Sequence, residues 1–245
     1  MTRRERRTNR SGAHSSLPAV SRWPAGGLRP SARVRFVNCD DPDYVTKNPL
    51  VLAGLTWKGS VRALTSGFAG NWFPLTWLSH MTDVRLFGLD SGAHHITSVL
   101  LHLASSALLF TALRRMTGAR WQSAFVALVF ALHPLHVESV ACISERKDVL
   151  SGFFWFLSLW CYGRYAERPG AGRYVLVLIP FILGLMAKQM VVTLLLVLLL
   201  LDVWPLQGTA RGYAFLFREK MPFFALSVTA SVVAFTVQRS GAAGQ

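Results

Sequence analysis

Three short polar motifs and one lysine hold most of the residues that could do chemistry in this sequence. The first motif, Asp40-Asp41-Pro42-Asp43, places three carboxylates within four residues. Carboxylates so close together raise one another's pKa, which suits a proton acceptor or a metal site. An Asx-Pro turn exposed to water would have the same composition. The residues alone therefore leave a catalytic interpretation and a turn interpretation open.

The second motif is the HPLHVE segment at residues 133–138, where an apolar stretch ends. Ionisable groups at membrane depth are costly, so they usually face a cavity or a pathway. Histidines three residues apart lie on one side of a helix, although Pro134 distorts the turn. The helical zinc signature instead spaces its histidines four apart, with Glu between them. We therefore expect His133, His136 and Glu138 to orient a substrate or the neighbouring loop, with metal binding as the alternative.

The third motif contains Glu145, Arg146 and Lys147, directly before another apolar stretch. Adjacent Arg and Lys side chains at a membrane interface hold a phosphate well, and Glu145 would orient the ligand beside them. An ordinary solvated loop has the same composition. Lys188 interrupts an otherwise continuous apolar stretch, so its charge needs a partner or water. We expect Arg146, Lys147 and Lys188 to bind a phosphate, with snorkelling to the surface as the alternative for Lys188.

Apolar stretches must position these motifs. Hydrophobic residues make up 52% of the 245 residues, and runs near 20 residues recur from position 93 onward. A helix of about 20 residues crosses the hydrocarbon core of a bilayer. The pattern predicts an all-α polytopic membrane protein with about six transmembrane helices, at 95–113, 121–141, 149–165, 173–188, 190–206 and 221–238.

The remainder of the sequence divides into two segments before the transmembrane domain, which we expect to cover residues 93–240. Residues 1–35 are rich in Arg, Ser, Gly and Pro and are predicted to be disordered. Residues 36–92 read as a loop that carries the acidic motif and short helices in the membrane interface, at 57–64 and 72–87. His94, His95 and His102 follow this loop, and packing or interface anchoring accounts for them.

The net charge of +14 raises the question of nucleic-acid binding, but the positions of the charges argue against it. Nine arginines precede Val37, and most of the others lie in alternate short loops, as the positive-inside rule describes. The arginine-bearing loops should be cytoplasmic. The segments around Asp40, Glu138, Arg146 and Lys188 then share the outer face, so we expect one site there and no nucleic-acid partner.

Several segments, in order, resemble a known family. They are residues 36–45 (FVNCDDPDYV), 71–77 (NWFPLTW), 133–140 (HPLHVESV), 144–151 (SERKDVLS) and 184–188 (GLMAK). Together they are similar to the membrane half of bacterial tetratricopeptide-repeat proteins, which are related to the transmembrane O-mannosyltransferases that act on cadherins. The likeness covers about residues 36–206.

The resemblance implies a class C glycosyltransferase-like bundle whose outer loop bears short interfacial helices. It also implies transfer of a sugar, mannose among the candidates, from a polyprenyl-phosphate donor to a protein or glycan hydroxyl. The family's catalytic acidic signature falls on Asp40 and Asp41. The expected location is the bacterial inner (cell) membrane, with the site facing the periplasm or exterior. The resemblance names no cofactor with certainty, and a divalent metal stays an alternative.

Two further hypotheses come from different classes of protein. Relatives have an apolar span before the acidic motif and continue into further spans and repeats, so we expect this chain to be shortened at both ends. Such a chain could be a non-catalytic membrane anchor. It could also be a transporter with Lys188 and the histidines along its path, but a transporter should pair its ionisable groups near the bilayer midplane. Here they gather at one interface.

Overall fold

The computed structural model describes residues 41–67, 71–206 and 212–242, in which helices joined by short turns are the regular structure and no strand is present. All of them belong to one structural unit, which covers residues 32–245. The predicted disordered segment 1–35 and Asp40 lie outside the described residues, so those predictions are untested. The elements in chain order are η1 (Pro42–Thr46), α1 (Pro49–Leu52), α2 (Trp57–Thr65), α3 (Pro74–Phe87), α4 (Ser91–Thr117), α5 (Arg120–Leu132), α6 (Leu135–Ala141), η2 (Ile143–Glu145), α7 (Arg146–Glu167), α8 (Ala171–Ala187), η3 (Gln189–Thr193), α9 (Leu194–Val203) and α10 (Tyr213–Ala242).

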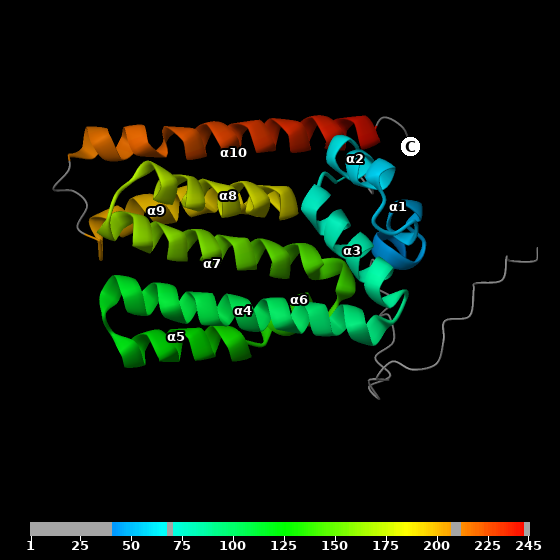
Figure 1. Ribbon diagram of the computed structural model, residues 1–245, viewed down its shortest axis with the longest axis horizontal. Helices are drawn as coiled ribbons and strands as arrows, with labels where there is room; N and C mark the ends of the chain where they lie inside the picture. Colours follow the sequence, from blue (N-terminus) through cyan, green and yellow to red (C-terminus); the bar gives the residue numbers. More distant parts are fainter. Residues whose placement is uncertain (1–40, 68–70, 207–211, 243–245) are drawn as a thin grey trace, which may run out of the picture. The chain divides into compact units, whose positions relative to one another are not determined.

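The longer helices lie side by side in a row. The helix α4 packs against α5 and α7, α7 packs against α8, and α8 packs against α10 (Figure 1). The short helices α1, α2 and α3 gather at one end of this row, on the right in Figure 1, where α4 and α7 begin and α8 ends. The structure therefore has two distinct ends, which we call the capped end and the arginine end. The arginine end carries the α4–α5 and α7–α8 turns.

Local sequence accounts for where the central helices begin and break. The Asp90 side chain caps α4 by accepting a hydrogen bond from the Ala93 N–H at 3.2 Å, and Gly118 ends the helix at a φ of 72°. Asp is a favoured N-cap, and glycine tolerates the left-handed conformation that closes many helices. Pro134 interrupts the next apolar segment, so α5 and α6 meet at an angle of 57°.

Part of the predicted membrane architecture is confirmed. Two helices are long and apolar enough to cross a bilayer, α4 and residues Ala214–Arg239 of α10, and the bent α5–α6 pair qualifies as one broken span or a re-entrant loop. The helix α8 and the segment Gln189–Val203 are apolar but shorter. The protein is thus a helical membrane protein, whereas six spans and a class C architecture stay predictions.

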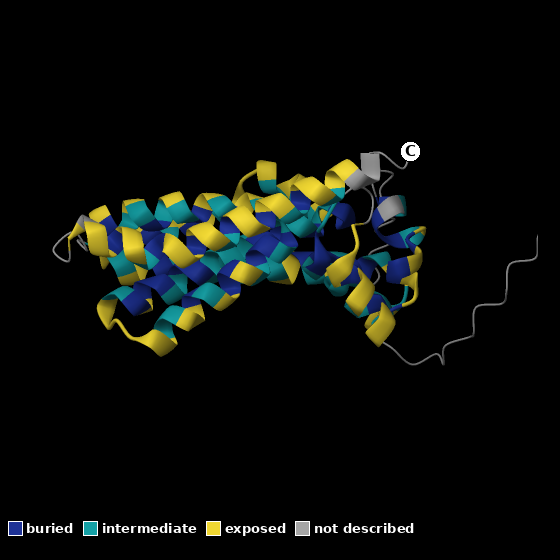
Figure 2. Cartoon of the chain, turned by 90° about the horizontal axis from the view of Figure 1, so that it is seen from above, coloured by how far each residue is buried: buried dark blue, intermediate teal, exposed yellow. Residues whose placement is uncertain are grey.

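Apolar side chains cover the outer faces of the helices as well as the core. Figure 2 shows exposed residues along the outer sides of the bundle and buried residues between the helices. Large exposed side chains include Leu128 on α5, Leu200 on α9 and Phe224 on α10, each more than half exposed. A soluble protein would rarely leave so much apolar surface in contact with water, so these faces fit contact with lipid.

The helices predicted at 57–64 and 72–87 are present as α2 and α3, whereas their location in the membrane interface stays a prediction. The helix α3 is more than an amphipathic surface helix. Its side chains Trp77, Met81 and His80 are fully buried. Trp77 and Met81 join Tyr44, Val45 and Ile143 in a small apolar core at the capped end. This core holds η1 against η2.

Candidate functional site

The capped end brings together polar residues from three separate parts of the chain. Asp41 precedes η1, residues 144–148 join η2 to α7, and Lys188 lies at the break between α8 and η3. The backbone of Lys188 is extended, with φ of −160° and ψ of 134°, so the apolar helix ends before it. The lysine side chain can therefore reach α7.

Asp41 is buried and tied to the third motif. One of its carboxylate oxygens, Oδ1, accepts a hydrogen bond from the Ser144 backbone N–H at 2.9 Å, and both residues are only 1% exposed. The two residues are 103 positions apart in the sequence. The predicted catalytic motif therefore docks on the segment that leads into Lys147 and Asp148. Catalysis by Asp41 stays a prediction, as does catalysis by Asp40.

Lys147 strengthens this docking. Its Nζ lies 4.6 Å from the centre of the Tyr44 ring, in cation–π geometry, and donates to Glu145 Oε1 at 3.0 Å. Burial lowers the pKa of Lys147, but the hydrogen bond to Glu145 and the contact with Tyr44 outweigh it, so the pKa is raised above its usual value. Lys147 is thus a cation at neutral pH, with Glu145 as its counter-ion.

Arg146 is fully buried, and each of its three guanidinium nitrogens has a partner within the protein. Nε donates to Ser98 Oγ at 2.9 Å, Nη1 to Ser79 Oγ at 3.1 Å and Nη2 to the His94 carbonyl at 2.7 Å. Nη1 also lies 2.9 Å from Asp83 Oδ2. Burial lowers the pKa of Arg146, and the Asp83 carboxylate opposes that shift. These contacts join α3, α4 and α7, so they favour a positioning role over the predicted phosphate contact, which stays untested.

The partners of Arg146 include residues that the sequence analysis did not single out. Asp83 is 4% exposed and also lies 3.6 Å from the Nδ1 of His94. The signal that could have revealed it is the spacing of Thr76, His80 and Asp83, which places three polar side chains on one face of α3. All three are buried in the structure.

His80 is the least satisfied member of this buried cluster. It is fully buried, and neither ring nitrogen has a hydrogen-bond partner in the described part of the chain. Burial, followed by the charge of Arg146, lowers the pKa of His80 well below its usual value. The ring is therefore neutral in the folded protein at pH values where a free histidine binds a proton.

This difference predicts a stability that depends on pH. Below about pH 6.5 the unfolded chain binds a proton at His80, whereas the folded protein does not. Protonation therefore favours the unfolded state, and the free energy of unfolding decreases as the pH falls below this value. The free energy of unfolding should fall by up to about 1.4 kcal/mol per pH unit from this group. Thermal unfolding of the detergent-solubilised protein between pH 7 and 5 measures it. The H80L variant should lose this part of the dependence, while H133Q, at an exposed histidine, should keep it.

Asp148 and Lys188 form an ion pair where two cavities meet. The first cavity has a volume of about 370 Å³ and the second about 280 Å³, and Asp148, Gly152 and Trp155 line both. Lys188 lines the second. The pair is partly exposed, at 33% for Asp148 and 26% for Lys188. Among the residues just described, these two therefore have the clearest access to a ligand.

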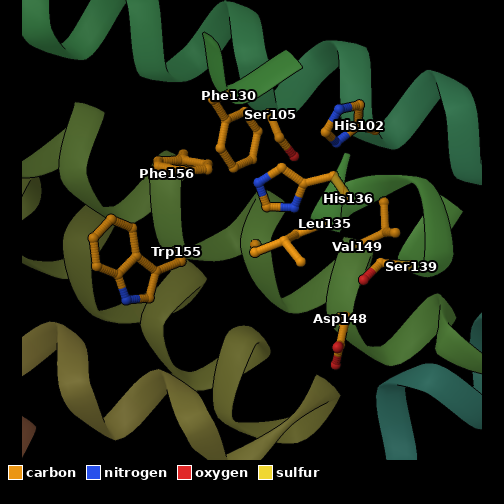
Figure 3. Close-up of a pocket in the computed structure, with 11 residues that line it drawn as sticks. His102, Ser105, Phe130, Leu135, His136, Ser139, Asp148, Val149, Trp155 and Phe156 are labelled. Atoms are coloured by element: carbon orange, nitrogen blue, oxygen red, sulfur yellow. The ribbon is translucent and has the colours of Figure 1, made fainter. Parts of the chain in front are cut away.

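The first cavity has an aromatic side and a polar side (Figure 3). His136 lies between them. The centre of its ring is 4.4 Å from the centre of the Phe130 ring and 5.5 Å from the centre of the His102 ring. Figure 3 places Phe156 and Trp155 on the aromatic side and Asp148 on the other. His133 lines an adjoining apolar groove of about 560 Å³, which shares His102 and His136 with the first cavity.

The predicted orienting residues therefore have different surroundings. His136 lines the cavity beside Asp148, His133 lines the adjoining groove, and Glu145 pairs with Lys147. Glu138 is exposed and lines neither of these cavities nor the groove. In the described ranges, no three His, Cys, Asp or Glu side chains converge as ligands for a metal ion, and Asp40 is outside those ranges. The orienting roles of all four residues stay predictions.

The fold and this arrangement define a helical membrane protein that gathers acidic, basic and imidazole side chains around cavities at one end. Residues 74–237 match the family model described as dolichyl-phosphate-mannose-protein mannosyltransferase. The chain belongs to this mannosyltransferase family, which confirms the relation that the sequence motifs indicated.

Individual relatives agree with the family. The chain is 36% identical over 105 residues to protein O-mannosyl-transferase tmtc2 of Xenopus laevis, an alignment that covers 43% of this chain and 13% of the relative. It is 30% identical over 178 residues to protein O-mannosyl-transferase Tmtc2 of Drosophila melanogaster, which covers 67% of this chain and 19% of the relative. The chain thus spans less than a fifth of the length of either relative. No solved structure matches the chain.

Proposed function

We propose that the capped end forms the site of a membrane glycosyltransferase, which transfers a sugar, mannose by preference, from a polyprenyl-phosphate donor to a protein hydroxyl. The observation that carries the proposal is the assembly of one site from distant segments. Asp41 is hydrogen-bonded to Ser144 of η2. Asp148 lies four residues after Ser144 and lines two cavities, and Lys188 reaches Asp148 from the α8–η3 break. The family match and the names of the relatives support the reaction class.

In the proposed reaction the acceptor hydroxyl oxygen attacks the anomeric carbon of the sugar. Asp41, or its neighbour Asp40, accepts the hydroxyl proton as general base. The bond between the anomeric carbon and the phosphate oxygen breaks, and its electron pair leaves with the polyprenyl phosphate. Negative charge therefore grows on the phosphate in the transition state, where a fixed cation stabilises it most.

Lys188 and Lys147 are the cations that we assign to the phosphate. Lys188 lines a cavity and is partly exposed, so an anionic ligand can compete with Asp148 for it. Lys147 lies within the same segment and stays protonated. We assign Arg146 to positioning, because its guanidinium is buried and bonded to α3 and α4. His136 would orient the donor from the cavity wall.

The charges of the turns support a sidedness for the proposed site. Arg114, Arg115 and Arg120 flank the α4–α5 turn, and Arg164, Arg168 and Arg173 flank the α7–α8 turn, all at the arginine end. Such turns usually face the cytoplasm. The capped end would then face the opposite side, which in a bacterium is the periplasm, and the donor would arrive within the membrane.

Lys188 provides the test of this proposal. In proteoliposomes that contain a polyprenyl-phosphate mannose and a serine- and threonine-containing peptide, we expect the protein to mannosylate the peptide. Because a charge-assisted hydrogen bond contributes about 1.5–3 kcal/mol, K188M should raise the KM for the donor about tenfold to a hundredfold. K188R keeps the charge and should retain most of the affinity. An unchanged KM in K188M would remove Lys188 from the donor site.

A further inference from the structure

The arginine end contains a cavity that the proposed reaction does not use. It has a volume of about 850 Å³ and lies between the α7–α8 turn and the first turns of α10. Pro169, Gly170 and Ala171 line it from the turn and the start of α8. The cavity is open to the surface and lies at one end of the membrane helices, so we place it at the depth of the lipid headgroups.

One unpaired cation faces this cavity. Arg218 lines it and is exposed, and no hydrogen bond or ion pair joins its side chain to another described residue. The neighbouring turn adds three more cations, Arg164, Arg168 and Arg173. Arg173 donates to the Arg168 carbonyl at 3.0 Å. The acidic residue of this turn, Glu167, pairs with Arg115 and interacts more weakly with Arg168 and Arg173, so the basic residues outnumber it. The local charge thus favours an anion.

The acidic residue in the lining, Glu219, is already engaged with other groups. Its Oε1 lies 2.7 Å from the Nζ of Lys220, and its Oε2 accepts a hydrogen bond from the Tyr165 hydroxyl at 3.0 Å. Lys220 also lies 2.9 Å from Asp202. These contacts turn the Glu219 carboxylate inward, so Arg218 is the charged group available to a ligand.

Apolar and aromatic surfaces adjoin the charged part of the cavity. Tyr165 and Tyr174 line it, and these amphipathic rings suit the boundary between headgroups and acyl chains. Phe215 also lines it and is 49% exposed. A ligand that satisfies the whole surface has an anionic head and long apolar chains.

We propose that this cavity binds the headgroup of an anionic phospholipid, with Arg218 contacting the phosphate and the acyl chains lying along the exposed faces of α8 and α10. Basic pockets at the ends of membrane helices recognise such headgroups through charge at the membrane surface. The proposal does not depend on glycosyl transfer. The site would tie the α7–α8 turn and α10 to the leaflet that is rich in anionic lipid.

Native mass spectrometry of the detergent-solubilised chain, titrated with phosphatidylglycerol or phosphatidylcholine, tests this site. We expect phosphatidylglycerol to bind more tightly than phosphatidylcholine. One basic residue near a membrane contributes about 1 kcal/mol to binding an anionic lipid, so R218Q should weaken the phosphatidylglycerol complex about fivefold. R218K should restore most of the affinity if the charge is what matters.

The matched control is R239Q, at an exposed arginine near the other end of the same helix. It should leave phosphatidylglycerol binding unchanged. Equal affinity for the two lipids, or an equal loss in R218Q and R239Q, would overturn the proposal. Competition by inorganic phosphate at similar concentrations would also overturn it, because the site would then recognise a free anion and not a lipid.

Discussion

Replacing Asp41 with Asn is expected to reduce the rate of sugar transfer by about a hundredfold to ten-thousandfold, the contribution usual for a general base. Asparagine has nearly the same volume and keeps a carbonyl oxygen that can accept the hydrogen bond from the Ser144 N–H. The docking of η1 on η2 should therefore survive, while the proton acceptor is lost. The loss should appear in kcat, with the KM for the donor close to that of the wild type.

The assay is mannose transfer in proteoliposomes, with membrane insertion and thermal unfolding measured in parallel. D90N is the matched control, because Asp90 caps α4 at the same end of the bundle and has no part in the proposed chemistry. D40N shows which of the two adjacent carboxylates is the base. Full activity of D41N together with inactive D40N would move the role to Asp40, and full activity of both would remove the acidic motif from the reaction.

The second large effect concerns the buried pair of Arg146 and Asp83. R146M would leave the Asp83 carboxylate buried beside His94 without its cation. Breaking a buried ion pair by removing one partner costs about 3–5 kcal/mol. We expect R146M to unfold at a markedly lower temperature than the wild type, and the D83L/R146M double variant to recover much of this loss because no uncompensated charge remains.

Activity measurements on the same variants separate positioning from phosphate binding. If Arg146 positions η2 and α7, the rate of sugar transfer should follow stability. It should fall in R146M and recover in the D83L/R146M double variant. A double variant that regains its stability but binds the donor as poorly as R146M would show that the guanidinium contacts the phosphate. That result would restore the role predicted from the sequence.

Much of the helical architecture was predictable because apolar length and turn chemistry are local signals. Pro134 marks the break between α5 and α6, and Lys188 marks the break between α8 and η3. The number of membrane spans stays a prediction, because α8 and the segment Gln189–Val203 are apolar but shorter than a full span. Their membrane depth depends on how they pack against one another, which a pattern along one segment does not contain.

The site was predictable in its outline and not in its pairings. The motifs at Asp41, Arg146 and Lys188 lie at the same end of the bundle, as their alternation with the arginine-rich loops indicated. The sequence did not reveal that Asp83 neutralises Arg146 or that Asp148 meets Lys188. Both pairings form between helices that are far apart in the sequence. The sequence alone does not show which Arg or Lys side chain is neutralised by such a partner and which stays available to a ligand.

Photo-crosslinking of the donor tests the central claim most directly. A polyprenyl-phosphate mannose that carries a photoreactive group beside the phosphate should label peptides from two segments, 144–156 and 188–193, which line the cavities at the capped end. Unlabelled donor should compete for this labelling, and K188M should reduce it. Competed labelling confined to peptides of the arginine end, such as 164–174 or 214–222, would contradict the account.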